Sequence, residues 1–232
     1  MIVKLMRHTS DAERLCGAAA LTTTKSGSPS EIFGKMDPEI AKKIIRKVTG
    51  YGHTSVIEHA SFTFSIEDAS RAMTHQLVRH RIASYTQQSQ RYVTYNTLNE
   101  YVTPPNIKTD PEAQTLYDAT LKEISEAYKK LLGMNIPKED ARYILPNASK
   151  TNIIVTMNAR ELRHFFNLRC CARAQWEMRE AANEMLKQAK KAAPTLFQNA
   201  GPSCVEMGFC PEGKRKPVEC NVAEIKARFG NM

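Results

Sequence analysis

The residues best suited to do chemistry gather in one polar segment, residues 76–92. This segment holds three arginines, one histidine, four glutamines and two serines, with no acidic residue and no lysine. Guanidinium groups grip phosphate through paired hydrogen bonds, and carboxamides both donate and accept hydrogen bonds along the edge of a base. The composition therefore predicts a site that binds phosphate and recognises planar amide groups.

Residues 158–169 form a second basic segment, which the spacing predicts to be a helix. Asn158 can cap that helix, and Arg160 and His164 share one of its faces because they are four residues apart. Leu162 and the two phenylalanines after it would lie on the buried side. Two interpretations stay open at this point: a ligand-binding helix, and an exposed basic helix over an apolar face.

Histidine, cysteine and acidic residues do not occur at the spacing of a common metal site. His53 and His59 are six residues apart with Glu58 between them, whereas a helical pair of zinc ligands is usually four apart. Neither the cysteines nor Ser89 stand in the flanking pattern of a known nucleophile. Without a secretory signal we expect reduced thiols, and zinc binding by the last three remains a weak alternative. The six cysteines are Cys16, Cys170, Cys171, Cys204, Cys210 and Cys220.

Length and charge restrict the class of protein. The 232 residues suffice for one large domain or two small ones. Lys and Arg number 33 against 24 for Asp and Glu, a net charge of +9, which predicts an anionic partner such as nucleic acid, a membrane surface or phosphorylated small molecules. No apolar run approaches the ~18 residues of a membrane-spanning helix. The apolar start, residues 1–5, is too short for a signal peptide, so we expect a cytoplasmic protein.

Strands and helices follow one another without regular alternation. Strands are predicted at residues 2–7, 61–66 and 151–157, with a further β-prone stretch at 90–95. No Gly-rich strand-to-helix turn of a dinucleotide-binding or P-loop fold occurs, so we expect an α+β fold. Helices are predicted to begin near Ser10, Pro38, either Asp68 or Ser70, Asp110, Pro137, Asn158 and Ala172, with a loop at 22–31 and a connector at 103–111.

Four ordered blocks of the sequence resemble the flavin-dependent thymidylate synthases. Arg79-His80-Arg81, followed by seven residues and then Ser89, is similar to the signature of that family. The segment 52–66, the Ala-Arg-Tyr-Ile-Leu-Pro block at 141–146 and the late helices of 158–177 resemble three further parts of it. The resemblance covers residues 1–197 as one domain. It leaves residues 198–232 as an irregular tail that contains cysteine, glycine and proline.

The resemblance implies a fold and a reaction. The implied fold is α+β, a single domain with a twisted, largely antiparallel sheet flanked by helices. The implied reaction makes dTMP from dUMP, with 5,10-methylenetetrahydrofolate as the carbon donor and NADPH reducing a bound FAD that passes on the hydride. The implied assembly is a homotetramer with active sites at subunit interfaces. No enzyme cysteine acts as a nucleophile in this family, and no metal is implied.

Roles for individual residues follow from the same resemblance. Arg169 would be the key catalytic group, because a fixed cation against the uracil favours ionisation at its N3. Ser89 would position the nucleotide, and His53 would lie near the flavin, where the folate or NADPH is expected. Contacts to FAD are implied for Ser55, Glu58, Arg79, His80, Arg81, Gln87, Asn158, Arg160 and His164. Contacts to dUMP are implied for Gln76, Arg79, Gln87, Gln88, Ser89, Gln90, Arg91, Arg142 and Arg169.

This chain departs from the family pattern at two of these positions. Many members have an acid where this chain has Gln87, which changes the contacts available to dUMP or the flavin. Position 164 is often Asn, whereas His164 can donate the same hydrogen bond but also titrates.

A nucleic-acid-binding protein is the main alternative explanation of the surplus positive charge. The arginine-rich segment lacks the spaced aromatics of an RNA-recognition sheet, and no helix-turn-helix or zinc-finger pattern occurs. A structural α+β protein with a basic surface is a third possibility, against which the four ordered blocks argue. We therefore expect small phosphorylated ligands, with neither nucleic acid nor membrane as a partner.

Overall fold

The computed structural model describes residues 1–94, 100–218 and 220–232. The chain divides into two compact units, each of which is described by itself. Unit 1 consists of residues 1–2, 66–79 and 86–153, and unit 2 consists of residues 3–65, 80–85 and 154–232. Within the described residues, no helix combines the length and the apolar character needed to cross a membrane.

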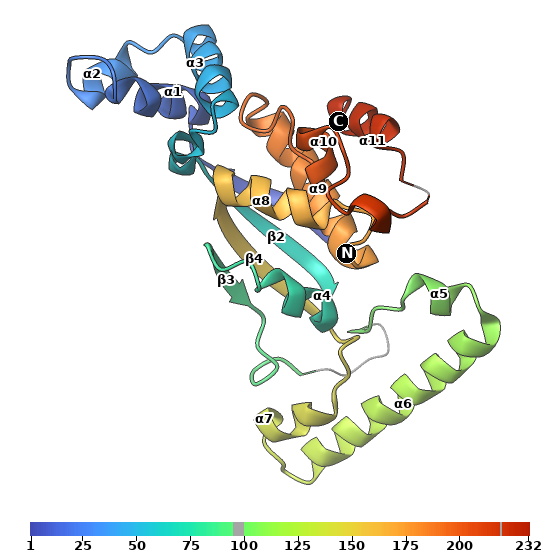
Figure 1. Cartoon of the computed structure of the whole chain (residues 1–232). Helices are drawn as coiled ribbons and strands as arrows, with labels where there is room; N and C mark the ends of the chain where they lie inside the picture. The colour runs from blue at the N-terminus through green and yellow to red at the C-terminus, as the bar shows by residue number, and fades with distance from the viewer. Residues whose placement is uncertain (95–99, 219) are drawn as a thin grey trace. The chain divides into compact units, whose positions relative to one another are not determined.

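A four-stranded sheet has the order β1-β2-β4-β3. Strands β2, β4 and β3 are labelled in Figure 1. The Thr63 and Thr156 hydroxyls meet at 2.9 Å, and the Asp68 amide donates to the Asn152 side chain at 3.0 Å. The numbering of β4 falls as that of β2 rises, so these strands are antiparallel, as predicted. The strands are β1 (Ile2–His8), β2 (Ser61–Ser70), β3 (Ala83–Gln87) and β4 (Lys150–Asn158).

One strand prediction is correct in kind but wrong in place. Strand β3 lies at residues 83–87, before the predicted β-prone stretch, and residues 90–94 of that stretch form no strand. The amides of Tyr92 and Val93 donate to the Ser89 carbonyl, at 3.2 and 3.0 Å, so these backbone groups close a turn instead of joining a ladder. Tyr95, the end of that prediction, lies outside the described residues.

The first helices of unit 2 are α1 (Ala12–Thr22), α2 (Pro29–Gly34) and α3 (Pro38–Gly50), followed by the 3₁₀ helix η1 (Thr54–His59). The loop predicted at 22–31 is wrong in its second half, where α2 begins. Ser28 accepts a hydrogen bond from the Glu31 amide, and the Glu31 carboxylate accepts one from the Ser28 amide. This capping box starts a helix in a segment that looks like a loop by composition.

Two long helices follow β4 in unit 2, α8 (Ala159–Arg169) and α9 (Trp176–Ala192). Asn158 caps α8 as predicted, since its side chain accepts a hydrogen bond from the Glu161 amide at 2.9 Å. Helix α8 packs on α9 and on η1. Its buried side carries Leu162, Phe165 and Phe166, which are fully inaccessible. The apolar stripe of the sequence therefore fixes which side of α8 remains available for polar side chains.

The tail from residue 198 is not irregular, which corrects the prediction. It forms α10 (Ser203–Met207), the 3₁₀ helix η4 (Gly213–Arg215) and α11 (Val222–Gly230). Phe229, 1% exposed, packs so closely on Gly201 that a Cβ there would lie 3.0 Å from the ring. The buried ammonium of Lys190 donates to the Phe229 carbonyl. This cation at the carboxyl end of α11, together with the buried ring, seats the last helix.

The helices of unit 1 begin where their caps predict. Ser70 accepts from the Met73 amide at 3.0 Å at the start of α4 (Arg71–Leu77), and Asp110 caps α6 (Pro111–Gly133). Between them the predicted connector holds a short helix, α5 (Pro105–Lys108). Tyr128 of α6 packs against Ala141 in a small core. That core anchors α7 (Lys138–Ala141) and the 3₁₀ helix η3 (Arg142–Ile144).

Candidate functional site

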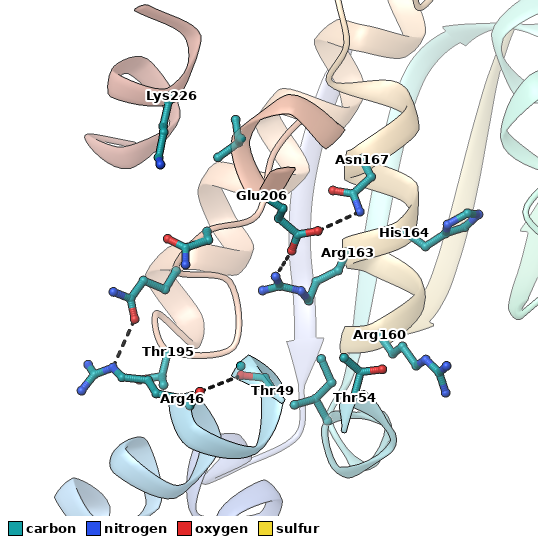
Figure 2. Close-up of a pocket in the computed structure, with 15 residues that line it drawn as sticks. Arg46, Thr49, Thr54, Arg160, Arg163, His164, Asn167, Thr195, Glu206 and Lys226 are labelled. Carbon is teal, nitrogen blue, oxygen red and sulfur yellow. Dashed lines mark hydrogen bonds and ion pairs between the residues drawn. The ribbon is translucent and has the colours of Figure 1, made fainter. Parts of the chain in front are cut away.

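A cavity of about 680 Å³ lies within unit 2 (Figure 2). Helices α3, η1 and α8 line it, and the tail with α10 and α11 adds further side chains. Its volume is within the range of small-molecule and cofactor sites. The lining residues are Arg46, Thr49, Gly50, Thr54, Ile57, Arg160, Arg163, His164, Asn167, Thr195, Gln198, Asn199, Val205, Glu206 and Lys226.

Helix α8 presents polar side chains on two sides. Arg163 and Asn167 point toward Glu206, and Arg160 and His164 project from the other side of the helix (Figure 2). The prediction that Arg160 and His164 share a face is therefore confirmed, and both line the cavity. Because the remaining side of α8 is buried, these four polar residues occupy the positions that the apolar stripe leaves free.

Positive charge predominates in the cavity lining. Arg46, Arg160, Arg163 and Lys226 contribute cations, whereas Glu206 is the one acidic residue among the described lining residues. Arg163 pairs with Glu206 and donates to the Leu196 carbonyl at 2.8 Å. Burial lowers the pKa of Arg163. A lining of this charge suits an anionic ligand.

The side chains of Arg160 and Arg46 are each held by one partner. Arg160 pairs with Glu58 at 2.5 Å, although both side chains are about half exposed to solvent. Arg46 donates from its Nε to Gln198 at 3.1 Å. The pair of Arg160 and Glu58 joins two residues that the family resemblance assigns to the same ligand.

A buried polar cluster in unit 2 joins α8 to the Arg-His-Arg signature. The Nε of Arg169 donates to Nε2 of His80 at 3.0 Å, and Nδ1 of His80 lies 3.3 Å from a carboxylate oxygen of Glu161. The His80 ring packs edge-on against Phe165 at 4.9 Å between centroids, and the Tyr85 hydroxyl donates to the His80 carbonyl at 2.8 Å. Of this cluster, Glu161 has no counterpart among the residues predicted from sequence.

Burial and charge set the protonation of this cluster. Desolvation, followed by the nearby charges of Arg169 and His164, lowers the pKa of His80 to about 4. Desolvation also raises the pKa of Glu161 and that of Tyr85, the latter with help from the Glu161 charge. His80 is therefore neutral at physiological pH, and its contact with Glu161 is a hydrogen bond more than an ion pair.

In unit 1 the glutamine-rich segment is fixed by its neighbours. The Gln87 amide donates to Thr74 at 2.9 Å and to Thr151 at 3.3 Å. The backbone amide of Gln88 donates to the Asn152 carbonyl at 2.9 Å, and the Gln88 side chain accepts from the Asn152 amide at 3.2 Å. The side-chain NH₂ group of Gln87 thus donates to two threonine hydroxyls. An ionised acid at this position could only accept hydrogen bonds from those hydroxyls.

Two arginines of unit 1 meet at one acidic residue. Arg91 pairs with the Glu139 carboxylate at 2.8 Å, and Arg142 donates to the Glu139 carbonyl at 3.1 Å. Ser89 accepts from the Arg91 amide at 3.2 Å, so the serine hydroxyl and the arginine belong to the same turn. The structure therefore brings together three residues, Ser89, Arg91 and Arg142, that sequence reasoning assigned to one substrate.

The predicted site residues divide between the two units. The predicted dUMP contacts lie in unit 1 except for Arg169, and the predicted FAD contacts lie in unit 2 except for Arg79 and Gln87. His80 and Gln90 are buried and Gln76 and Ser89 are partly buried, whereas His53, Ser55 and Arg81 are exposed.

Several residues of the cavity and of the buried His80 cluster were not predicted from the sequence. Arg46 and Lys226 lie in segments outside the four blocks, and Glu206 lies in the tail that was expected to be irregular. Glu161 lies in the first turn of a helix, where an acidic residue is usually exposed and interacts favourably with the helix dipole. Its spacing of four from Phe165 was the one available signal, since that places Glu161 beside the buried side of α8.

The cysteines are free thiols. Burial raises the pKa of Cys16 to about 12, and it also raises the pKa values of Cys170 and Cys204, so these thiols stay protonated. Among the described residues, no group of three or more His, Cys, Asp or Glu side chains could hold a metal ion.

Comparison with known proteins places these features in a family. The model of the family described as "Thymidylate synthase complementing protein" matches residues 4–195. The flavin-dependent thymidylate synthase of Geobacter sulfurreducens is 47% identical over 234 residues, covering 100% of this chain and 99% of that protein. The one from Pyrococcus abyssi is 47% identical over 209 residues, covering 87% of this chain and 86% of that protein.

A solved structure is similar in fold. The crystal structure of the flavin-dependent thymidylate synthase ThyX from Helicobacter pylori, complexed with FAD and dUMP, superposes with a TM-score of 0.70. The two sequences are 25% identical, and the match covers 87% of this chain and 100% of that chain.

Proposed function

The chain belongs to the family of flavin-dependent thymidylate synthases, and we propose that its two units supply the cofactor contacts and the nucleotide contacts of that family's reaction. As a member it methylates dUMP to dTMP, with 5,10-methylenetetrahydrofolate as the carbon donor and NADPH as the reductant of FAD. The family match removes the support for a nucleic-acid-binding protein, because small phosphorylated ligands account for the arginine clusters.

The cavity of unit 2 is the proposed FAD site. FAD is an anion with a pyrophosphate, and the cavity lining combines four cations with the hydrogen-bonding groups of His164 and Asn167. The residues present therefore fit the cofactor in charge and in donor chemistry. Arg160 and His164 would hold it from α8. Ser55 and Glu58 of η1 lie beside the lining residues rather than among them, and Glu58 would support the cofactor through its ion pair with Arg160. When bound, the flavin supplies hydride-transfer chemistry, so the protein must orient the reactants and stabilise charge.

The other proposed FAD contacts carry restrictions that the structure imposes. The side-chain oxygen of Asn158 already accepts from the Glu161 amide, so its NH₂ group is the part left for a ligand. Both ring nitrogens of His80 are engaged within unit 2. Arg79 and Arg81 are exposed on either side of His80 and are better placed to reach an anion.

The proposed dUMP contacts centre on the turn at residues 88–91 of unit 1. Arg91 and Arg142, which both contact Glu139, offer two guanidinium groups for the phosphate, and Ser89 offers a hydroxyl from the same turn as Arg91. Gln76, Gln87, Gln88 and Gln90 supply carboxamides that match the polar edge of a pyrimidine. The ion pair of Arg91 with Glu139 is about half exposed to solvent, and such a pair contributes only about 0–1 kcal/mol, so little stability is lost when Arg91 turns to a phosphate.

Arg169 is the proposed catalytic cation. Its Nε is occupied by His80, and within the described part of the chain its two terminal NH₂ groups make no hydrogen bond. These groups would face the uracil and stabilise negative charge that develops at N3. Ser89 would position the nucleotide. His53, exposed at the start of η1, would lie on the side where the folate or NADPH approaches.

The proposed assembly is a cytoplasmic homotetramer whose active sites lie at subunit interfaces. The family resemblance is its main support. Light scattering after gel filtration measures the mass directly, and a monomer that binds FAD and turns over dUMP would contradict the assembly.

Arg169→Ala tests the proposed site. The purified wild-type protein should be yellow, and its flavin absorbance should bleach with NADPH in the absence of oxygen. The variant should retain FAD and this bleaching, because Arg169 is assigned to the nucleotide, while dTMP formation falls by roughly 10²-fold or more. Turnover within a few-fold of wild type would refute the role of Arg169. A folded wild-type protein that binds no FAD would refute the proposed function as a whole.

A further inference from the structure

Three residues of unit 2 form a chain of hydrogen bonds that ends at a buried carboxylate. Arg169 donates from Nε to Nε2 of His80 at 3.0 Å, and the other ring nitrogen of His80 lies 3.3 Å from Glu161. The His80 side chain is 4% exposed and the Glu161 side chain 8%. The side chains of His80 and Glu161 are thus shielded from water, and a buried, satisfied hydrogen-bond network of this kind is rigid.

The donor and acceptor roles in this chain follow from chemistry alone. The Nε of arginine always carries a hydrogen, so Nε2 of His80 must accept. A neutral imidazole has one N–H, which must then be on Nδ1, and that N–H can only point to Glu161. Glu161 therefore selects the tautomer of His80 that is able to accept from Arg169.

The environment keeps His80 in that tautomer. Desolvation and the charges of Arg169 and His164 lower the pKa of His80, so the ring is neutral and Nε2 has a free lone pair. Phe165 packs edge-on against the ring at 4.9 Å and limits its rotation. The Tyr85 hydroxyl holds the His80 backbone by donating to its carbonyl at 2.8 Å.

We propose that Glu161 is a positioning residue for Arg169, acting through His80 to fix the plane of the guanidinium. With Nε anchored, rotation about the end of the arginine side chain is restricted, and both terminal NH₂ groups keep one direction. Arginine loses less entropy per hydrogen bond when its fork is held in place beforehand. This inference rests on the proposed role of Arg169 at the uracil, and it assigns the orientation of that cation to an acid that touches no substrate.

Two substitutions at position 161 separate positioning from packing. Glu161→Met keeps the length of the side chain but removes the acceptor, whereas Glu161→Gln keeps an oxygen that can accept from Nδ1–H. Glu177→Gln is the matched control, since Glu177 is also a buried acid of unit 2, 2% exposed. If the methionine variant does not fold, as judged by thermal unfolding, Glu161→Ala replaces it, because water can then fill the space.

The readouts are FAD content, bleaching by NADPH, the KM and kcat of dTMP formation, and the Kd of dUMP from its effect on the flavin spectrum. For Glu161→Met we expect unchanged FAD content and bleaching, with kcat/KM for dUMP lowered about 10- to 100-fold, the range of a misplaced catalytic group. Glu161→Gln should recover to within about fivefold of wild type by the same reasoning, and Glu177→Gln should remain at wild-type kcat/KM.

Repeating Glu161→Met in the Arg169→Ala background identifies the route. If Glu161 acts through Arg169, the second substitution should not weaken dUMP binding further, because the group it positions is gone. An equal further loss in that background would overturn the proposal, as would a methionine variant within twofold of wild type or a glutamine variant as impaired as methionine. These results leave the proposed function intact. The role of Arg169 fails separately if Arg169→Ala retains full turnover, and the proposed function fails if the folded wild-type protein binds no FAD.

Discussion

Gly17→Ala should destabilise unit 2, because α1 and α3 pack closely against one another at this glycine. A Cβ at Gly17 would lie 2.8 Å from the Cβ of Ala41 and 2.9 Å from its Cα. Carbon atoms at rest are about 3.5–4.0 Å apart, so the helices must separate by roughly 0.7 Å or more. One of the two contacts is with the Cα atom of Ala41, which belongs to the backbone and cannot move away as the end of a long side chain can.

The magnitude comes from two opposing contributions. Forcing a methyl group into a packed contact costs about 1–3 kcal/mol, while replacing glycine within a helix returns up to about 1 kcal/mol of helix propensity. Gly34→Ala is the matched control, since nothing lies within 4 Å of a Cβ there and its φ is not positive. It should stabilise by about 0.4–1 kcal/mol. The two variants should therefore differ by about 1–3 kcal/mol in unfolding free energy.

Thermal unfolding of the two variants measures this difference. For a chain of this size, 1 kcal/mol corresponds to about 2–4 °C, so Gly17→Ala should melt about 2–12 °C below Gly34→Ala. A functional effect should accompany it, because α3 carries Arg46 and Thr49 into the cavity. FAD should bind more weakly to Gly17→Ala and equally well to Gly34→Ala. If Gly17→Ala melts at or above the temperature of Gly34→Ala, the tight helix contact is refuted.

Two further predictions concern acidity and the tail. Because the pKa of His80 is about 4 in the folded chain against 6.5 in the unfolded one, the unfolded chain binds the extra proton as the pH falls from about 6.5 to 4, and stability is lost over that interval. Over this pH interval the unfolding free energy of the wild type should fall by up to about 3 kcal/mol more than that of His80→Gln. Urea unfolding at pH 7 and pH 4.5 measures the change, and an equal loss of stability in both proteins would contradict the prediction. Phe229→Ala removes the ring that seats α11, a contact of about 3–5 kcal/mol, so limited proteolysis should cut the tail much faster, whereas wild-type digestion rates would argue against it.

The elements that position the site were largely predictable because their signals are local. The caps Ser70, Asp110 and Asn158 each start the helix that they predict, and the alternating apolar residues of β2 are buried as expected. Helix α2 was missed although Ser28 and Glu31 have the spacing of a capping box, since the surrounding Thr, Ser and Gly outweighed it. Local rules succeed where one residue decides the conformation of its neighbours.

Residues of the candidate site could be predicted only where they belong to a recognisable sequence motif. The signature around His80 led to the arginines, but the partner of His80 is Glu161, 81 residues away in sequence. No propensity or spacing rule links two such positions, because their contact depends on how α8 packs. Arg46 and Lys226 were not predicted for the same reason. Nothing in the sequence around them distinguishes either residue from an ordinary surface cation, and the packing of α3 and α11 brings both to the cavity.

The tail gives this cavity a wall that the family's common core does not define. The family model ends at residue 195, whereas Val205, Glu206 and Lys226 of the cavity lie beyond it. An inhibitor built only for the shared cofactor contacts would address any member of the family alike. One extended toward Glu206 and Lys226 would instead depend on the residues that each member carries after its core, so selectivity between members of this family could be sought at the tail.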